Sequence, residues 1–221
     1  MPATDPPAVL LDVDGTLIDS NYQHALAWYR ALRERGRTFA LVDLHRHIGM
    51  GGDQLVKSVA GEAFDAEHGE AASDAEKLRF REIAGDLSPL EGAKELIAEL
   101  RERGCEVVLA SSGSAEDTER SMQLLEATEL KHTTSSDVEQ TKPEPDLIKA
   151  ALELVEGDRE ALLVGDSTWD CEAAERAGVR SVGVLTGGFS EAELREAGAE
   201  RVYRKLTDLI ADLDDLLGSL S

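Results

Sequence analysis

The sequence has little cysteine, few aromatic residues and no long hydrophobic run. Its 221 residues include two cysteines, Cys105 and Cys171, far apart in the chain, and only 4% of the residues are aromatic. Two thiols in separate elements exclude both a disulfide framework and a cysteine-based metal site. We interpret both as buried thiols.

Basic residues are also scarce. Lysine and arginine number 23 against 45 acidic residues, so the formal net charge is −22. Because such a surface repels a phosphate backbone, we expect no nucleic-acid partner. The same field slows the approach of anionic substrates unless the site is locally positive or salt screens the rest. A high-salt cytoplasm is an environment that suits so acidic a surface.

Membrane and export signals are missing as well. No segment approaches the roughly 20 apolar residues that a spanning helix needs. The start of the sequence, Met1 to Pro7, has neither the basic region nor the apolar stretch of a signal peptide. We therefore expect a cytoplasmic protein with no membrane partner. Its 42% of hydrophobic residues suffice for a full globular core.

Two different patterns divide the chain. Residues 21–87 have helical apolar spacing and no convincing strand, whereas strands and helices alternate after Gly92. Such alternation predicts an α/β fold, a Rossmann-like parallel sheet with helices on both faces. We expect residues 1–20 and 88–221 to form this core and residues 21–87 to form an inserted, all-helical cap. The later strands are expected at 106–111, 133–135, 161–165, 181–185 and 201–203, and the later helices at 93–103, 115–127, 145–155, 168–177, 191–197 and 206–217.

Two acids end the first predicted strand. Asp12 follows the apolar residues 8–11, and Asp14 comes two residues later. Side chains alternate along a strand, so both carboxylates point the same way. They repel each other and resist desolvation unless a cation lies between them, and all-oxygen ligands suit Mg²⁺. A strand followed by a solvated acidic turn is the alternative.

Polar residues also follow two later strands. Ser111, Ser112 and Gly113 come at the end of one, and Asp166, with Asp170 one helical turn further on, comes at the end of another. Ligands of open parallel sheets lie beyond the carboxyl ends of the strands, so we expect these groups to converge with the first two acids. The alternative is that both sets only cap the helices that follow them.

Lys142 lies in the stretch Thr141-Lys142-Pro143-Glu144-Pro145. Proline restricts the backbone, so this lysine is suited to holding its ammonium group against negative oxygens. A surface lysine in a loop is the alternative.

The stretch from Asp12 to Ser20, Asp-Val-Asp-Gly-Thr-Leu-Ile-Asp-Ser, resembles the first motif of the haloacid dehalogenase superfamily, in its phosphatase and phosphomutase branch. Ser111, Lys142 and the segment from Gly165 to Asp170 resemble the second, third and fourth motifs, in the family's order. The resemblance covers nearly the whole chain. It implies a phosphatase that needs Mg²⁺.

The resemblance also implies roles for these residues. Asp12 is the candidate nucleophile that forms an aspartyl phosphate, and Asp14 the candidate acid and base, with its main-chain carbonyl on the metal. Asp166 is expected to bind Mg²⁺ directly, and Asp170 to act through water or by orienting other groups.

The remaining motif residues are expected to hold the phosphoryl group. Ser111 would hydrogen-bond it, and Lys142 would steady both the phosphoryl oxygens and the nucleophile. Ser112 and Gly113 would add backbone amides at a helix N-terminus.

The expected cap offers two candidate substrate contacts, His24 and His47. The stretch Tyr22 to Trp28 is similar to that of β-phosphoglucomutase, where the matching histidine couples cap closure to the acid/base aspartate. A hinge or packing role for His24 is the alternative.

His47 lies in a second stretch with His45 and three glycines, which we interpret as a substrate-facing loop or as a flexible turn with solvated histidines. Within it, Gly51-Gly52-Asp53 occupies the place where a mutase of that type is expected to carry a basic, sugar-phosphate-binding loop. This departure weakens the mutase interpretation.

The sequence therefore predicts a phosphatase that acts on a small phosphorylated metabolite, of the phosphoglycolate or sugar phosphate class. A phosphomutase of the β-phosphoglucomutase type and a non-catalytic, phosphate-binding regulatory protein are the alternatives. A dehalogenase of this superfamily lacks the second acid, so Asp14 argues against that activity.

Overall fold

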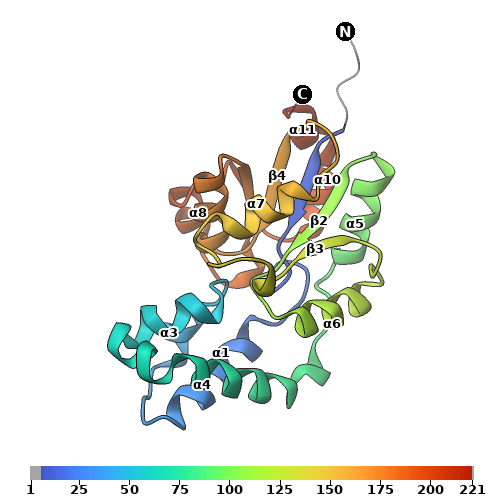
Figure 1. The fold of residues 1–221 in the computed structure, drawn as a ribbon. Helices are drawn as coiled ribbons and strands as arrows, with labels where there is room; N and C mark the ends of the chain where they lie inside the picture. The colour runs from blue at the N-terminus through green and yellow to red at the C-terminus, as the bar shows by residue number, and fades with distance from the viewer. Residues whose placement is uncertain (1–5, 221) are drawn as a thin grey trace.

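A six-stranded parallel sheet forms the centre of the protein, in the order β3-β2-β1-β4-β5-β6 (Figure 1). The computed structural model describes residues 6–220, and residues 1–5 and 221, which the predicted division assigns to the core, lie outside this range. The strands are β1 (Ala8–Leu11), β2 (Glu106–Ala110), β3 (Lys131–Thr133), β4 (Ala161–Gly165), β5 (Arg180–Val184) and β6 (Arg201–Tyr203).

The central strands are apolar at successive positions because helices cover both faces of the sheet. In β1, Val9 and Leu11 belong to one apolar cluster, and Leu10 between them belongs to another. The predicted α/β fold is confirmed. Helices α5 (Ala93–Glu102), α6 (Ala115–Leu125), α10 (Leu206–Ala211) and α11 (Leu213–Gly218) pack in the first cluster, and α7 (Asp146–Glu153) and α8 (Thr168–Ala177) in the second.

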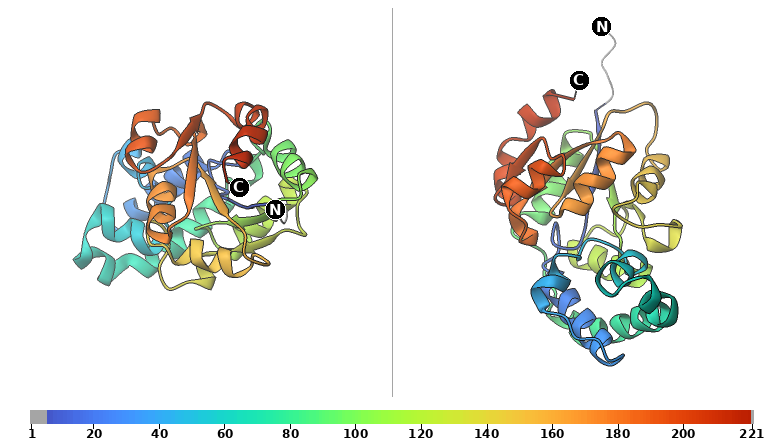
Figure 2. Two further views of the ribbon diagram at one scale, coloured as in Figure 1. Left: turned by 90° about the horizontal axis from the view of Figure 1, so that it is seen from above. Right: turned by 90° about the vertical axis from the view of Figure 1, so that its left-hand side faces the viewer.

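A helical segment, residues 21–87, separates β1 from the rest of the sheet in the sequence. It packs around its own apolar cluster, which includes Trp28, Leu32 and Leu55, and it lies at one end of the molecule (Figures 1 and 2). Its helices are α1 (Asn21–Arg33), α2 (Leu41–His45), α3 (Gly52–Ala60) and α4 (Glu62–Arg81). Within residues 6–220, no helix combines the length and apolar character needed to cross a bilayer.

Two expectations about single elements are wrong. The strand expected at 133–135 lies at Lys131–Thr133, because the side chains of Thr134 and Asp137 cap a short 3₁₀ turn that begins at Ser135. The single closing helix expected at 206–217 is two helices. It breaks at Asp212, whose carboxylate accepts hydrogen bonds from Tyr203 and Arg201 of β6.

The order of the strands marks the place for a site. After β1 the chain adds β2 and β3 on one side, then crosses over and adds β4, β5 and β6 on the other. In such sheets the loops after the two strands at the crossover diverge and leave a crevice at their carboxyl ends. Here these strands are β1 and β4, which lead into Asp12 and Asp166.

Candidate active site

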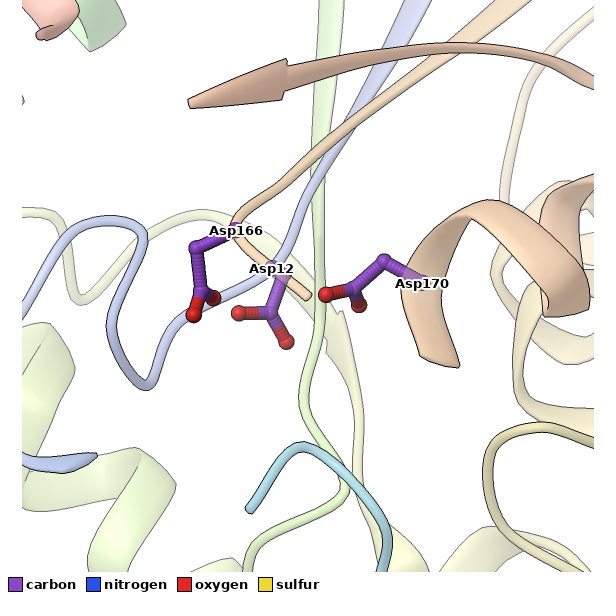
Figure 3. A group of neighbouring side chains, drawn as sticks. All are labelled: Asp12, Asp166 and Asp170. Atoms are coloured by element: carbon purple, nitrogen blue, oxygen red, sulfur yellow. The ribbon is translucent and has the colours of Figure 1, made fainter. Parts of the chain in front are cut away.

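Three aspartates converge at the carboxyl end of the sheet (Figure 3). Asp12 follows β1, Asp166 follows β4, and Asp170 lies in the first turn of α8. Each offers a carboxylate oxygen within 4.8 Å of the other two. All three residues are buried, with exposed fractions of 4%, 1% and 0%. The structure thus brings together three of the acids that the sequence singled out.

Lys142 is fully buried among these acids. Its Nζ donates to Asp12 Oδ1 at 2.5 Å and to the main-chain oxygen of Ala110 at 3.0 Å, and lies 2.7 Å from Asp170 Oδ1. Burial disfavours the charged ammonium, but the two carboxylates outweigh this effect and raise the pKa of Lys142. The lysine therefore remains charged and fixes one oxygen of Asp12.

The cluster holds more negative than positive charge, since three carboxylates face one ammonium group. Burial and the neighbouring Asp170 raise the pKa of Asp12 to about 7, although Lys142 opposes this. Burial, together with Asp12 and Asp170, also raises the pKa of Asp166 well above its ordinary value. A divalent cation would remove this repulsion, and oxygen ligands suit such a cation. The residues present therefore fit a divalent metal ion.

Asp166 is held by two residues near the first strand. Thr16 Oγ1 donates to its Oδ1 at 2.9 Å, and Asn21 Nδ2 donates to its Oδ2 at 2.9 Å. Gly187 approaches so closely that a Cβ atom there would lie 1.6 Å from Asp166 Oδ2, so only glycine fits. Asn21 was not predicted as a site residue, and its place directly after the first motif was its only signal in the sequence.

Asp170 has two partners, one for each oxygen. Its Oδ2 accepts from the backbone N–H and the hydroxyl of Ser167, at 3.1 and 2.5 Å, in a capping box at the start of α8. Its Oδ1 pairs with Lys142. Asp170 therefore closes the helix and orients the lysine at the same time.

The carboxylate of Asp14 lies outside this trio. Its Oδ1 accepts from Ser20 Oγ at 2.6 Å and lies 3.4 Å from His24 Nε2. Burial opposes ionisation, but His24 and Ser20 outweigh it and lower the pKa of Asp14. The other oxygen, Oδ2, lies near Gly113, where an added Cβ would be 3.4 Å away.

His24 bridges Asp14 and a second acid, Glu76 of α4. Its Nδ1 lies 3.0 Å from Glu76 Oε1, and its ring stacks on Phe80 with centroids 3.8 Å apart. Burial disfavours the imidazolium, but the two carboxylates raise the pKa of His24 to about 10. Glu76 was not predicted as a site residue, because one acid among many on a polar helix carries no local signal.

The residues after β2 complete the polar rim. Ser111 is buried, and its hydroxyl accepts from the Gly113 backbone N–H at 3.0 Å. The buried hydroxyl of Ser112 finds no hydrogen-bond partner within the described residues. Ser112 and Gly113 line a cavity together with Asp12 and Asp14.

This cavity, of about 100 Å³, opens between the end of the sheet and the helical segment. His47 is not among its lining residues. The His47 ring packs against Trp169 at 6.1 Å between centroids, and its Nδ1 contacts the main-chain oxygen of Asp43. The helical segment lines the cavity with His24, Trp28, Ile48, Gly49, Met50, Gly51, Gly52, Ser73, Glu76 and Lys77.

Known proteins share both the sequence pattern and the structure. A family model described as haloacid dehalogenase-like hydrolase matches residues 6–178. The phosphoglycolate phosphatase of Pseudomonas putida is 30% identical over 223 residues, covering 95% of this chain and 79% of the relative. The pyrophosphatase PpaX of Bacillus cereus is 26% identical, covering 94% and 96%.

A solved structure extends the comparison to three dimensions. A hydrolase from Pseudomonas syringae superposes with a TM-score of 0.90 at 33% identity, covering 95% of this chain and 99% of that one. The family model alone spans well over half of the sequence. The chain is therefore an enzyme of the haloacid dehalogenase-like hydrolase family, as its motifs predicted.

Proposed function

We propose that this protein is a Mg²⁺-dependent phosphatase that hydrolyses a small phosphomonoester through an aspartyl phosphate on Asp12. One observation carries the proposal. Asp12 has one oxygen fixed by Lys142, lies within a cluster of acids suited to a divalent cation, and shares a cavity with Asp14. Phosphoryl transfer needs mainly alignment and charge neutralisation, which this arrangement can supply.

The proposed reaction has two displacements. An oxygen of Asp12 forms a bond to phosphorus as the bond to the leaving oxygen breaks, and Asp14 gives that oxygen its proton. Water then attacks the same phosphorus, Asp14 takes up the proton of the water, and the bond to Asp12 breaks to release phosphate. Asp12 and Asp14 thus return to their starting states.

The position of Asp14 suits it to donate and then accept these protons. Ser20 and His24 both contact Oδ1, so Oδ2 is the oxygen left toward the cavity. The low pKa of Asp14 suits the second step, in which it acts as a base. For the first step it must hold a proton, and the negative charge of a bound phosphoryl group would raise its pKa. Ser112 and its unpaired hydroxyl are placed to donate to the phosphoryl oxygens.

Asp12, Asp166 and the main-chain carbonyl of Asp14 would hold the Mg²⁺ ion. When bound, the ion supplies positive charge that offsets the carboxylates and the phosphoryl oxygens. Asp170 would act by orienting Lys142, since both of its oxygens already have partners.

We further propose that the helical segment is a cap and that residues 1–20 and 88–221 form the catalytic core. The segment contributes most of the residues that line the cavity, so it would exclude water and select the leaving group. The names of the relatives point to different substrates, a carboxylate-bearing phosphomonoester in one case and pyrophosphate in the other.

A substrate panel tests the proposal. Phosphate release would be measured from phosphoglycolate, pyrophosphate and several sugar phosphates, with Mg²⁺ and with excess EDTA. We expect turnover of at least one phosphomonoester that requires Mg²⁺, and a loss of about 10³-fold or more in Asp12→Asn. Full activity of that variant would exclude Asp12 as the nucleophile.

A phosphomutase remains the second candidate, because His24 lies beside Asp14. A mutase has to hold a second phosphate in the cap. The loop from Ile48 to Gly52 lines the cavity without a basic side chain, and Lys77 is the cation that α4 contributes. Isomerisation of a hexose 1-phosphate without net phosphate release would favour the mutase over the phosphatase.

A further inference from the structure

Within the described residues, the backbone N–H and the hydroxyl of Thr141 form hydrogen bonds only with the helical segment. Its backbone N–H donates to Asp53 Oδ2 at 3.1 Å, and its hydroxyl donates to Asp53 Oδ1 at 2.5 Å. The same hydroxyl accepts from the backbone N–H of Gly51 at 3.0 Å. Thr141 itself is buried, with an exposed fraction of 3%. We call these three hydrogen bonds the Asp53–Thr141 latch.

The latch requires glycine at position 51. A Cβ atom at Gly51 would lie 2.3 Å from Thr141 Oγ1 and 2.6 Å from Asp53 Oδ1. Gly51 has φ −73°, which any residue can adopt, so the need for glycine here is steric. The loop is therefore shaped to approach Thr141 closely.

Thr141 directly precedes Lys142, whose ammonium holds Asp12 Oδ1. The backbone that carries the lysine is thus bound on one side by a residue of α3, some 90 positions earlier in the sequence. Asp53 itself is not among the cavity-lining residues, whereas Gly51 and Gly52 are. The hydrogen bonds of Asp53 with Thr141 therefore link it to the site without contact with the substrate.

We propose that Asp53 is a positioning residue, which sets the backbone of Lys142 through Thr141 when the helical segment is seated over the sheet. The ammonium then meets Asp12 in the geometry that the reaction needs. This inference rests on the proposed function, because it assigns Asp53 a part in the same reaction. It also explains why an acid stands in a loop that a mutase would be expected to make basic.

Steady-state kinetics of four variants tests the proposal. Asp53→Ala removes both acceptors, and Thr141→Val removes the hydroxyl while keeping the shape of the side chain. Because small misplacements of a catalytic group are costly, we expect each to lower kcat by about 10- to 100-fold, with KM nearly unchanged. Thr141→Ser keeps both hydrogen-bonding groups and should restore most of kcat. Asp43→Asn, an exposed acid of α2, removes a charge from the same segment and should leave kcat as it is.

The double variant Asp53→Ala/Thr141→Val shows whether Asp53 and Thr141 affect kcat together or independently. If both residues act through the latch, the double variant loses no more than the worse single variant. Multiplied losses, or a wild-type kcat for Asp53→Ala, would overturn the proposal. A loss in Asp43→Asn equal to that in Asp53→Ala would also overturn it, since the effect would then be one of charge.

Hydrogen exchange gives a readout that needs no turnover. Peptides that contain the Thr141 amide should exchange faster in Asp53→Ala than in Asp43→Asn, because the amide has lost its acceptor. Equal exchange would show that the latch does not form. If the wild-type protein released phosphate from no substrate, the proposed function would fail, and the exchange experiment would still decide whether the latch exists.

Discussion

When no metal is bound, ionisation of Asp12 destabilises the folded protein, and the effect therefore depends on pH. The pKa of Asp12 is raised to about 7, mainly by burial and by Asp170, from an ordinary 3.8. A group whose pKa is higher in the folded state stabilises the fold while it is protonated. That contribution is complete below pH 3.8 and is lost as the pH rises to about 7.

Replacing Asp12 by Asn should therefore stabilise the metal-free protein near neutral pH. We expect melting temperatures in EDTA to be similar at pH 4 and to diverge toward pH 7, by about 2–4 °C for each kcal/mol gained. Asp19→Asn, an exposed acid of the same loop, is the matched control. Parallel curves for the wild type and Asp12→Asn would contradict the raised pKa.

Glu76 helps Asp14 to keep His24 protonated. Burial alone would disfavour the imidazolium, but Asp14 and Glu76 raise the pKa of His24 to about 10. In Glu76→Gln we expect the imidazole to titrate about one to three pH units lower, and still above 6.5 because Asp14 remains. NMR titration of the His24 ring measures this directly. Glu67→Gln, beside the half-buried His68, should leave His24 unchanged, and an unaltered titration in Glu76→Gln would exclude the pairing.

The sequence predicted the site residues that follow strands and missed those that depend on contacts between distant elements. Asp12, Ser111 and Asp166 each end an apolar run, so a rule about parallel sheets sufficed to bring them together. The partner of His24 lies 52 residues away and that of Thr141 lies 88 residues away. No local pattern distinguishes Glu76 and Asp53 from the many other acids of the chain, so their roles required the packing of α3 and α4 to be known.

At the level of elements, β1 is the strand on which the site depends. Its residues alternate between two apolar clusters, so neither face of the strand is solvent-exposed. This burial on both sides is why β1 is a short apolar run without polar alternation, as is typical of strands in parallel sheets. It also fixes the direction in which Asp12 leaves the sheet.

Consecutive positions of β1 should be equally sensitive to truncation. Leu10 and Leu11 are both fully buried, one in each cluster. We expect Leu10→Ala and Leu11→Ala each to reduce the free energy of unfolding by about 2–5 kcal/mol. Leu78→Ala on α4, where the side chain is 58% exposed, should change it by less than about 0.5 kcal/mol. Urea denaturation measures all three, and tolerance at Leu10 or Leu11 would show that one face is not packed.

Elements at the edge of the fold were harder to predict than those at its centre. The shifted position of β3 and the break at Asp212 both follow from side-chain hydrogen bonds, of Thr134 with its own turn and of Asp212 with β6. Such bonds compete with helix and strand formation where few apolar contacts decide the outcome. In β1 and β4 apolar burial dominates, so the pattern of the sequence was sufficient.

At the scale of the whole molecule, the charge of the surface opposes the proposed chemistry. The net charge of −22 repels a phosphorylated substrate, and the acids at the site add to this repulsion in the metal-free state. Lys142, the His24 imidazolium, Lys77 and a bound divalent cation oppose this repulsion at the site. We therefore expect kcat/KM at low ionic strength to be limited by the approach of the anion.

The same charge should make stability depend on salt. Many of the 45 acids pair with the 23 bases at the surface, but the excess of acids leaves a net repulsion in the compact state. Salt shortens the screening length from about 10 Å at 0.1 M to about 3 Å at 1 M, so it weakens the long-range repulsion more than the close pairs. We expect the melting temperature to rise by several degrees between these KCl concentrations. Choline chloride should act alike if screening is the cause, whereas a rise with KCl alone would indicate specific potassium binding. The double variant Glu70→Gln/Glu119→Gln removes two exposed acids and should reduce the dependence of the melting temperature on salt. A melting temperature independent of salt would mean that repulsion between the surface acids does not destabilise the fold.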